Sequence, residues 1–336
     1  MNYPIIELKE LSKNYGSLKA VDNLNLTINK GEIFGLLGPN GAGKTTSILM
    51  MLGLTEPSHG TAIVCSENST RNPIRVKRKV GYLPDNVGFY NHMTAIENLI
   101  FIARLNDISY NEAANRALEV LKRVGLTHAS HKKTGTFSRG MKQRLGLAEV
   151  LIKKPEILIL DEPTLGIDPS GVNEFLNLLK QLSREEGLTV LLSSHHLHQV
   201  QRICDRIGIF VGGRLLVEGS IQELTSELLG NNGYTTSIQL QEAHPTPQQL
   251  KNTIEALPSV ARVNIHELDI EISTTENITP QIVRKLVEEG AAIGSVNQKT
   301  YNLDDIYEKY FENTPSHSLN DSKNKISKKR INERSN

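Results

Sequence analysis

The stretch Gly38-Pro-Asn-Gly-Ala-Gly-Lys-Thr-Thr46 decides how this chain folds. It follows a short apolar run, Glu32–Leu37, and it precedes a second apolar run that begins at Thr46. The spacing G-x-x-x-x-G-K-[ST] between a strand and a helix predicts a loop whose backbone N–H groups surround phosphates. The start of the following helix adds the positive end of its dipole. The sequence therefore predicts a nucleoside triphosphate site at this loop.

The loop also predicts individual roles. The Lys44 amine is expected to reach the β- and γ-phosphates, and the Thr45 hydroxyl is expected to hold Mg²⁺. The alternative is a glycine-rich turn that binds nothing, and it is disfavoured because the full pattern occurs in its full context. The predicted nucleotide-binding residues of the loop are Gly38, Pro39, Asn40, Gly41, Ala42, Gly43, Lys44, Thr45 and Thr46.

A second motif supplies carboxylates. The apolar run Ile157–Leu160 is followed directly by Asp161 and Glu162, which is the form of a Walker B motif. Asp161 is expected to bind in the Mg²⁺ shell. Glu162 lies one residue further on, where it could polarise the attacking water as a general base. A strand that ends in an ordinary acidic turn is the alternative, and the phosphate loop in the same domain weighs against it.

Composition sets the limits of the interpretation. The 336 residues suggest two domains and a tail, and the net charge of +1 argues against a binder of polyanions, so no nucleic acid partner is expected. The widely separated Cys65 and Cys204 suggest reduced structural thiols in a cytosolic protein. The beginning of the sequence does not read as a signal peptide. No run reaches the ~18 apolar residues that a membrane span needs.

The chain reads as two domains and a tail. Residues 1–221 alternate short apolar strands with helical patterns, which is typical of an α/β fold. Residues 222–312 predict the order β-α-β-β-α-β, a small ferredoxin-like α+β domain, after a hinge at 230–233. Residues 313–336 are polar and read as a disordered tail. Its basic run 328–330 is interpreted as solvated rather than as a contact with anionic lipid.

Several elements of the first domain are predicted from local patterns. Antiparallel strands are expected at 5–11 and 24–28, ahead of the phosphate loop. The region 94–124 is expected to be helical, with Ser109 as a helix cap. The run 207–217 is expected to form a hairpin through Gly212-Gly213.

The stretch Phe137-Ser-Arg-Gly-Met-Lys-Gln-Arg144 indicates a family. With the two motifs above it resembles the nucleotide-binding subunit of an ATP-binding cassette (ABC) transporter, over residues 4 to about 220. The common form of the family's signature is Leu-Ser-Gly-Gly-Gln, so Ser138 and Gly140 match whereas Arg139 and Met141 depart. Such departures resemble the branch that serves export-type permeases of the ABC-2 kind.

The resemblance implies a fold and an assembly. The fold is a P-loop NTPase core of the ABC type, with an antiparallel subdomain and a helical subdomain. Ser138 is expected to cap a helix that starts near Gly140, and the start of a helix can face a γ-phosphate. In the family this phosphate is bound by the opposite subunit, so Ser138 and Gly140 are expected nucleotide contacts of a dimer with two composite sites. The dimer could be a homodimer or a heterodimer with a second cassette.

Three further positions match the family. The run Leu165–Pro169 resembles the D-loop, which crosses the dimer interface, and His195 resembles the switch histidine that contacts the γ-phosphate. Because His196 and His198 follow, a metal cluster is the alternative, and it is disfavoured because no Cys or carboxylate stands at ligand spacing. Tyr15 occupies the place of the aromatic that stacks on adenine, and this role is favoured over the alternative of a half-buried strand tyrosine.

Asp85, in Gly81-Tyr-Leu-Pro-Asp85, departs from the family, which usually has Gln there. A carboxylate can still order a Mg²⁺-bound water, so Asp85 is expected in the metal shell with Thr45 and Asp161. The following stretch, Asn86–Met93, is expected to lie on the surface that receives the permease in the family. Its aromatic residues, Phe89 and Tyr90, suit an interface, and the alternative is that they pack under the helices.

The resulting prediction is an ATPase that powers an ABC transporter from the cytoplasmic face of the membrane, with ATP and Mg²⁺ as ligands. Lys44, Glu162 and His195 are the expected catalytic residues, and a separate integral-membrane permease is the expected partner. The motif Tyr301–Tyr307 resembles the end of the accessory domain found in the ABC-2 branch. The alternatives are a soluble ABC ATPase acting on ribosomes, DNA or protein assemblies, and a nucleotide-gated binding module without useful turnover.

Overall fold

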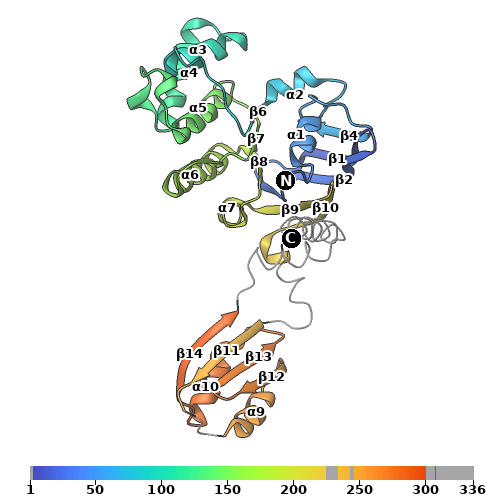
Figure 1. Ribbon diagram of the computed structural model, residues 1–336, viewed down its shortest axis with the longest axis vertical. Helices are drawn as coiled ribbons and strands as arrows, with labels where there is room; N and C mark the ends of the chain where they lie inside the picture. Colours follow the sequence, from blue (N-terminus) through green and yellow to red (C-terminus); the bar gives the residue numbers. More distant parts are fainter. Residues whose placement is uncertain (1–2, 225–233, 243–245, 300–306, 308–336) are drawn as a thin grey trace, which may run out of the picture. The chain divides into compact units, whose positions relative to one another are not determined.

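The computed structural model describes residues 3–224, 234–242, 246–299 and 307 of the chain (Figure 1). They divide between Ser220 and Ile221 into two compact units. The predicted hinge 230–233, the closing motif 301–307 apart from its last residue, and the tail lie outside the described residues. Within the described ranges, no helix has both the length and the apolar character that crossing a bilayer requires.

The first unit contains two β-sheets. Its strands are β1 (Pro4–Tyr15), β2 (Leu18–Asn29), β3 (Ile33–Leu37), β4 (His59–Val64), β5 (Glu67–Asn68), β6 (Val80–Leu83), β7 (Ile157–Asp161), β8 (Thr189–Ser194), β9 (Arg206–Val211) and β10 (Arg214–Gly219). One sheet has the order β2-β1-β4-β5, and its strands pair antiparallel. The other has the order β10-β9-β3-β8-β7-β6.

The six-stranded sheet positions the site. Strands β9, β3, β8, β7 and β6 run parallel, and β10 pairs antiparallel with β9 as the predicted hairpin. Every residue of β3, β7 and β8 is buried, as in a parallel sheet that is covered on both faces. Because parallel strands share a direction, the segments that follow Leu37, Leu83, Asp161 and Ser194 meet at one edge of the sheet.

The helices of the first unit fall into two groups. They are α1 (Lys44–Met51), α2 (Pro73–Lys79), α3 (Ala95–Leu105), α4 (Tyr110–Arg123), α5 (Arg139–Leu151), α6 (Pro169–Glu186) and α7 (Leu197–Ile203), with short 3₁₀ helices η1 (Thr127–Ala129) and η2 (Thr134–Thr136). Figure 1 shows α3, α4 and α5 gathered as a helical subdomain, separate from α1 and α2. These three helices, which lie close together in the sequence, also contact one another in the structure.

The region predicted to be helical from 94 to 124 forms two helices. Asp107, with φ 62°, ends the first of them in a left-handed turn. Ser109 caps α4 as predicted, because its side chain accepts a hydrogen bond from the backbone N–H of Glu112. Thr94 and Glu97 form a capping box at the start of α3. Local polar residues therefore fix both helix starts.

The second unit has the predicted β-α-β-β-α-β order. Its elements are β11 (Tyr234–Leu240), α9 (Pro247–Glu255), β12 (Val260–His266), β13 (Asp269–Thr274), α10 (Thr279–Glu288) and β14 (Ile293–Lys299). The sheet order β12-β13-β11-β14 is antiparallel throughout. Side chains from β13, α9 and α10, among them Ile272, Leu250 and Ile282, form one buried cluster. Alternate residues of the strands supply this face, as a half-covered sheet requires.

Candidate functional site

The phosphate loop is built around Lys44, the first residue of α1. The Lys44 side chain is buried, and its Nζ donates hydrogen bonds to the carbonyl oxygens of Gly38 at 2.6 Å and Pro39 at 3.2 Å. Gly43 caps the helix with φ 106°, and a Cβ there would lie 2.3 Å from the carbonyl oxygen of Ala20. Only glycine fits both the dihedral angle and the space.

Hydroxyl and carboxylate oxygens meet beside the loop. The Thr45 hydroxyl donates to Asp161 Oδ2 at 2.7 Å, and the Ser193 hydroxyl donates to Asp161 Oδ1. Asp161 is 3% exposed, so its charge is shielded from bulk water. These are the hard oxygen ligands that Mg²⁺ prefers, and the set formed by Thr45 and Asp161 fits that ion. Ser193 was not among the predicted site residues.

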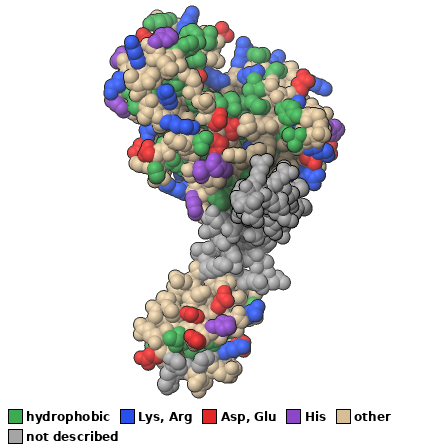
Figure 2. All heavy atoms as spheres, in the orientation of Figure 1, with side chains coloured by type: hydrophobic (Ala, Val, Ile, Leu, Met, Phe, Trp, Pro, Cys, Tyr) green, Lys and Arg blue, Asp and Glu red, His purple; other side chains and the backbone are tan. Residues whose placement is uncertain are grey.

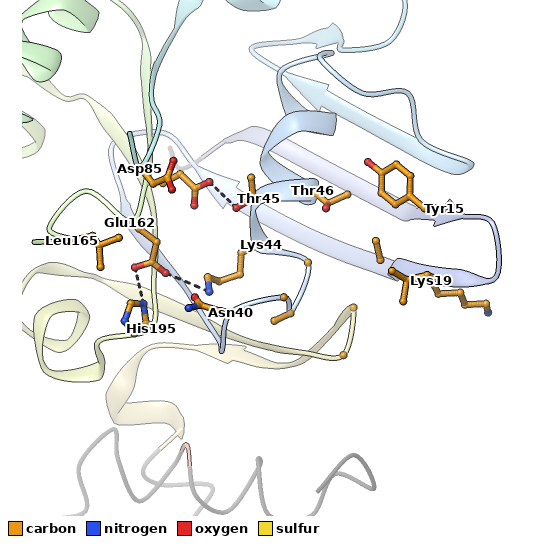
Figure 3. A pocket seen from close by; sticks show the side chains of 18 residues that line it. Tyr15, Lys19, Asn40, Lys44, Thr45, Thr46, Asp85, Glu162, Leu165 and His195 are labelled. Carbon is orange, nitrogen blue, oxygen red and sulfur yellow. Dashed lines mark hydrogen bonds and ion pairs between the residues drawn. The ribbon is translucent and has the colours of Figure 1, made fainter. Parts of the chain in front are cut away.

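Glu162 lies between a lysine and a histidine (Figure 3). Its Oε1 is 3.5 Å from Lys44 Nζ, and its Oε2 is 2.9 Å from His195 Nδ1. The Glu162 backbone has φ 48°, which is unusual for a residue with a side chain. Figure 2 shows acidic and histidine side chains near one another on the visible face of the first unit. The carboxylate is thus placed by charge on one side and by a hydrogen bond on the other.

Most of the predicted residues line one cavity of 710 Å³. The predicted residues that line it are Tyr15, Asn40, Gly41, Ala42, Gly43, Lys44, Thr45, Thr46, Asp85, Asp161, Glu162 and His195. Gly38 and Pro39 contribute through the carbonyls that hold Lys44. Lining residues that were not predicted are Leu18, Lys19, Ala20, Leu165, Gly212 and Gly213.

The ring of Tyr15 is available at the mouth of this cavity. Tyr15 is 50% exposed at the end of β1, and Lys13 Nζ lies 5.1 Å from the centre of its ring. A half-exposed aromatic face is what stacking on a base requires.

Asp85 lies next to Tyr82, which belongs to β6. Burial raises the pKa of Tyr82 to about 12, and the charges of Asp161 and Asp85 act in the same direction. The tyrosine is therefore neutral, and the negative charge on this side of the cavity comes from the two aspartates.

Ser138 and Gly140 lie apart from this cavity. They line a second cavity of 220 Å³, together with Ile167 and Asp168. The Ser138 hydroxyl accepts a hydrogen bond from the Met141 backbone N–H at 3.3 Å, so it caps α5 as predicted. Within the described part of one chain, the signature residues and Lys44 therefore belong to different cavities.

The comparison with protein families matches residues 21–165 to the family described as ABC transporter. The chain is 38% identical to the linearmycin resistance ATP-binding protein LnrL of Bacillus subtilis (strain 168), over 86% of this chain and 91% of the relative. It is 44% identical to the bacitracin transport ATP-binding protein BcrA of Bacillus licheniformis, over 64% of this chain and 69% of the relative.

Solved structures agree with these relatives. The structure of cbiO1 from Clostridium perfringens, described as part of the ABC transporter complex cbiONQ, is 31% identical with a TM-score of 0.62, covering 67% of this chain and 92% of its own. A dimeric bacterial ABC transporter cassette is 28% identical with a TM-score of 0.59, covering 64% of this chain and 98% of its own. The predicted resemblance is confirmed. The chain belongs to the ABC transporter family, in which it is an ATP-binding subunit that hydrolyses ATP.

Proposed function

We propose that two copies of this cassette, or this cassette and a second one, close over ATP and thereby drive a separate membrane permease of the export type. The observation that carries the proposal is the separation of the two cavities. Lys44 and Glu162 line one, whereas Ser138 lines the other, so each chain offers two complementary halves of a site. The names of LnrL and BcrA, a resistance protein and a transport protein, support the export direction.

The proposed binding roles follow from the geometry. Lys44, whose amine already binds carbonyl oxygens, would exchange them for phosphate oxygens. Tyr15 would stack on adenine. Thr45, Asp161 and Asp85 would hold Mg²⁺, which neutralises phosphate charge when it is bound.

The proposed chemical roles rest on Glu162 and its neighbours. Glu162 would take a proton from the water that attacks the γ-phosphorus, while the bond to the ADP oxygen breaks. Lys44, at 3.5 Å, would hold this carboxylate in place. His195, at 2.9 Å, would hold the other oxygen and contact the γ-phosphate. Ser138, from the opposite chain, would complete the site.

The proposed partner explains where the protein would act. Among the described residues no helix could span a bilayer, so the membrane part of a transporter would come from another chain. The cassette would then lie on the cytoplasmic face of the membrane, bound to that permease. The stretch Asn86–Met93 includes Tyr90, which is 49% exposed and stacks edge-on with Phe101, and this surface is the proposed contact.

Affinity purification from gently solubilised cells tests the proposal. The tagged full chain should bring down a polytopic membrane protein, and the complex should hydrolyse ATP. Recovery of ribosomal proteins, DNA or a soluble partner would overturn the transporter assignment in favour of another class of ABC ATPase. A Lys44→Ala chain, purified in parallel, separates partner binding from ATP turnover.

A further inference from the structure

The ring of His196 stacks on the ring of His195. The two ring centres are 3.9 Å apart and the ring planes are inclined by 40°. On its other side His195 is bound through Nδ1 to Glu162 Oε2 at 2.9 Å. His195 is therefore held between a carboxylate and a second imidazole. Among the described residues His196 does not line the 710 Å³ cavity, and its ring contact with the site is made through His195.

The backbone of His196 is fixed at the turn between β8 and α7. Its N–H donates to the Ser194 hydroxyl at 3.0 Å. Its carbonyl oxygen accepts from the N–H groups of Gln199 at 3.2 Å and Val200 at 3.4 Å, which begin the helix. Val200 is fully buried. The fixed backbone places the His196 ring against the His195 ring, where it can restrict the rotation of that ring.

We propose that His196 is a positioning residue for ATP hydrolysis, and that its ring holds the His195 imidazole in register with the Glu162 carboxylate. The inference rests on the proposed role of His195. A ring that is free to rotate would lose the hydrogen bond to Glu162 for part of the time, and misplacement of a catalytic group lowers the rate of the chemical step.

The charges around the pair make this positioning sensitive to pH. Glu162 faces His195 from the end of β7, and Lys44 faces Glu162 from α1. Asp85 and Asp161 line the same cavity, and His198 follows on α7. Burial and the neighbouring His195 lower the pKa of His196, whereas Glu162 opposes that shift. The His196 ring is therefore neutral at pH 7, and it gains a charge only at lower pH.

A positive charge on His196 would oppose one on His195. Protonation of His196 would place a positive charge directly against the His195 ring, at a distance of 3.9 Å between the ring centres. Because a charged imidazolium loses more hydration on packing than a neutral ring does, we expect this protonation to disrupt the stack and to form part of the acid limb of the ATPase profile.

The test compares the native protein and three variants, all purified at full length, over a range of pH. His196→Ala removes the ring, and we expect kcat to fall roughly tenfold at neutral pH because His195 is no longer held. His196→Phe keeps an aromatic ring without a titratable nitrogen. We expect it to retain kcat near neutral pH and to move the acid limb down by about 0.5 pH unit, the size of a partly screened charge pair. His128→Phe, on the exposed η1 turn, is the matched control and should match the native profile.

Titration with a fluorescent ATP analogue keeps the result interpretable. Because His196 lies outside the cavity, ATP affinity should be the same in all variants, and this also shows that they are folded. Superimposable rates and profiles for the native, Phe and Ala proteins would overturn the proposal. So would an equal loss of kcat in Phe and Ala, since stacking would then have no role. Failure of the native chain to engage a permease would instead count against the proposed function, because the pH profile needs only ATP.

Discussion

Glu162 shows how a single residue is shaped by its surroundings. Its backbone is in the left-handed region, with φ 48°, and such a conformation costs about 1–3 kcal/mol for a residue with a side chain. Its N–H donates to the Ser193 carbonyl at 3.2 Å, which ties the turn to β8. The turn directs the carboxylate to Lys44 and His195 rather than to solvent. Its Oε1 is buried without a hydrogen bond from the described residues, and an ion pair with Lys44 compensates for it.

Replacing Glu162 with Gln tests its role at this scale. Gln keeps the size of the side chain but cannot accept a proton, so we expect ATP to bind and the chains to dimerise while kcat falls by about 10²–10³. Single-turnover hydrolysis and size-exclusion chromatography with ATP would measure the two effects. Glu186→Gln, at the end of α6, removes a surface ion pair with Arg123 away from both cavities and is the control. Near-native turnover in the Glu162→Gln protein would exclude Glu162 as the base.

The sequence predicted the site unevenly at this scale. Lys44, Asp161 and Glu162, which line the cavity, could be chosen from the sequence because each lies within a continuous motif at a fixed distance from the end of a strand. Ser193 was missed as a partner of Asp161, because the pairing depends on strand register: Asp161 of β7 stands opposite Ser193 of β8. Gly213 was predicted only as part of a hairpin, yet its N–H donates to the Ala42 carbonyl at 2.9 Å and braces the loop.

The helix α5 is the element that joins the signature to the sheet. Its first turn is capped by Ser138, and near its other end Glu149 is largely buried with a pKa raised to about 7 by burial. Lys153, one turn further on, directs its Nζ to the Lys77 carbonyl at 2.6 Å, and its charge only partly offsets the shift. The carboxylate is therefore carried at a cost to the stability of the fold.

That cost predicts how stability depends on pH. The pKa of Glu149 is raised from 4.5 to about 7 in the folded protein. The free energy of unfolding is therefore highest below pH 4.5, where the side chain is neutral in both the folded and the unfolded state, and it falls as the pH rises to about 7. Glu149→Gln should therefore gain stability over the native protein across this range, by an amount on the order of 3 kcal/mol above pH 7. Chemical unfolding at pH 5 and pH 8 measures the difference. Glu119→Gln, an exposed change on α4, should show no such trend, and a Glu149→Gln protein without it would contradict the assigned burial effect.

Element boundaries were predicted best where apolar residues carry the pattern. The buried strand β7 begins at Ile157, where the apolar run of the second motif begins. By contrast β1 was predicted to end at residue 11, and it continues to Tyr15. Its last residues are polar, and Asn14 pairs with Lys19 across the turn into β2. Backbone pairing extends a strand where the side chains leave no periodic signal.

At the scale of the whole molecule, the two cavities of the first unit make the dimer testable. Mixing Lys44→Ala and Ser138→Arg chains, each inactive alone, should restore ATPase activity. In a heterodimer one composite site combines the intact halves, so random pairing should recover about a quarter of the native rate. A mixture of Lys44→Ala and Glu162→Gln chains alters the same half twice and should recover none. A complete absence of recovery in the first mixture would mean that the site is complete within one chain.

The fold class was predictable at this scale because two regular patterns divide the chain. Alternating strands and helices predicted the first unit, and the β-α-β-β-α-β order predicted the second. What the sequence did not contain was which cavity each motif would line, since that depends on the packing of α5 against the rest of the first unit. Family resemblance, rather than periodicity, supplied the expectation that Ser138 serves another chain's nucleotide.

The bonds that the Lys44 ammonium makes within the protein have a further consequence, which concerns the rate of product release. Two carbonyl oxygens and one carboxylate oxygen already surround the ammonium, at 2.6, 3.2 and 3.5 Å. A phosphate oxygen that binds there competes with these internal partners, so its net gain is the difference between two similar bonds. When ADP leaves, the ammonium can bind the same three oxygens again. Because these internal bonds replace the bonds to the nucleotide, we expect the product to dissociate quickly and without a release factor.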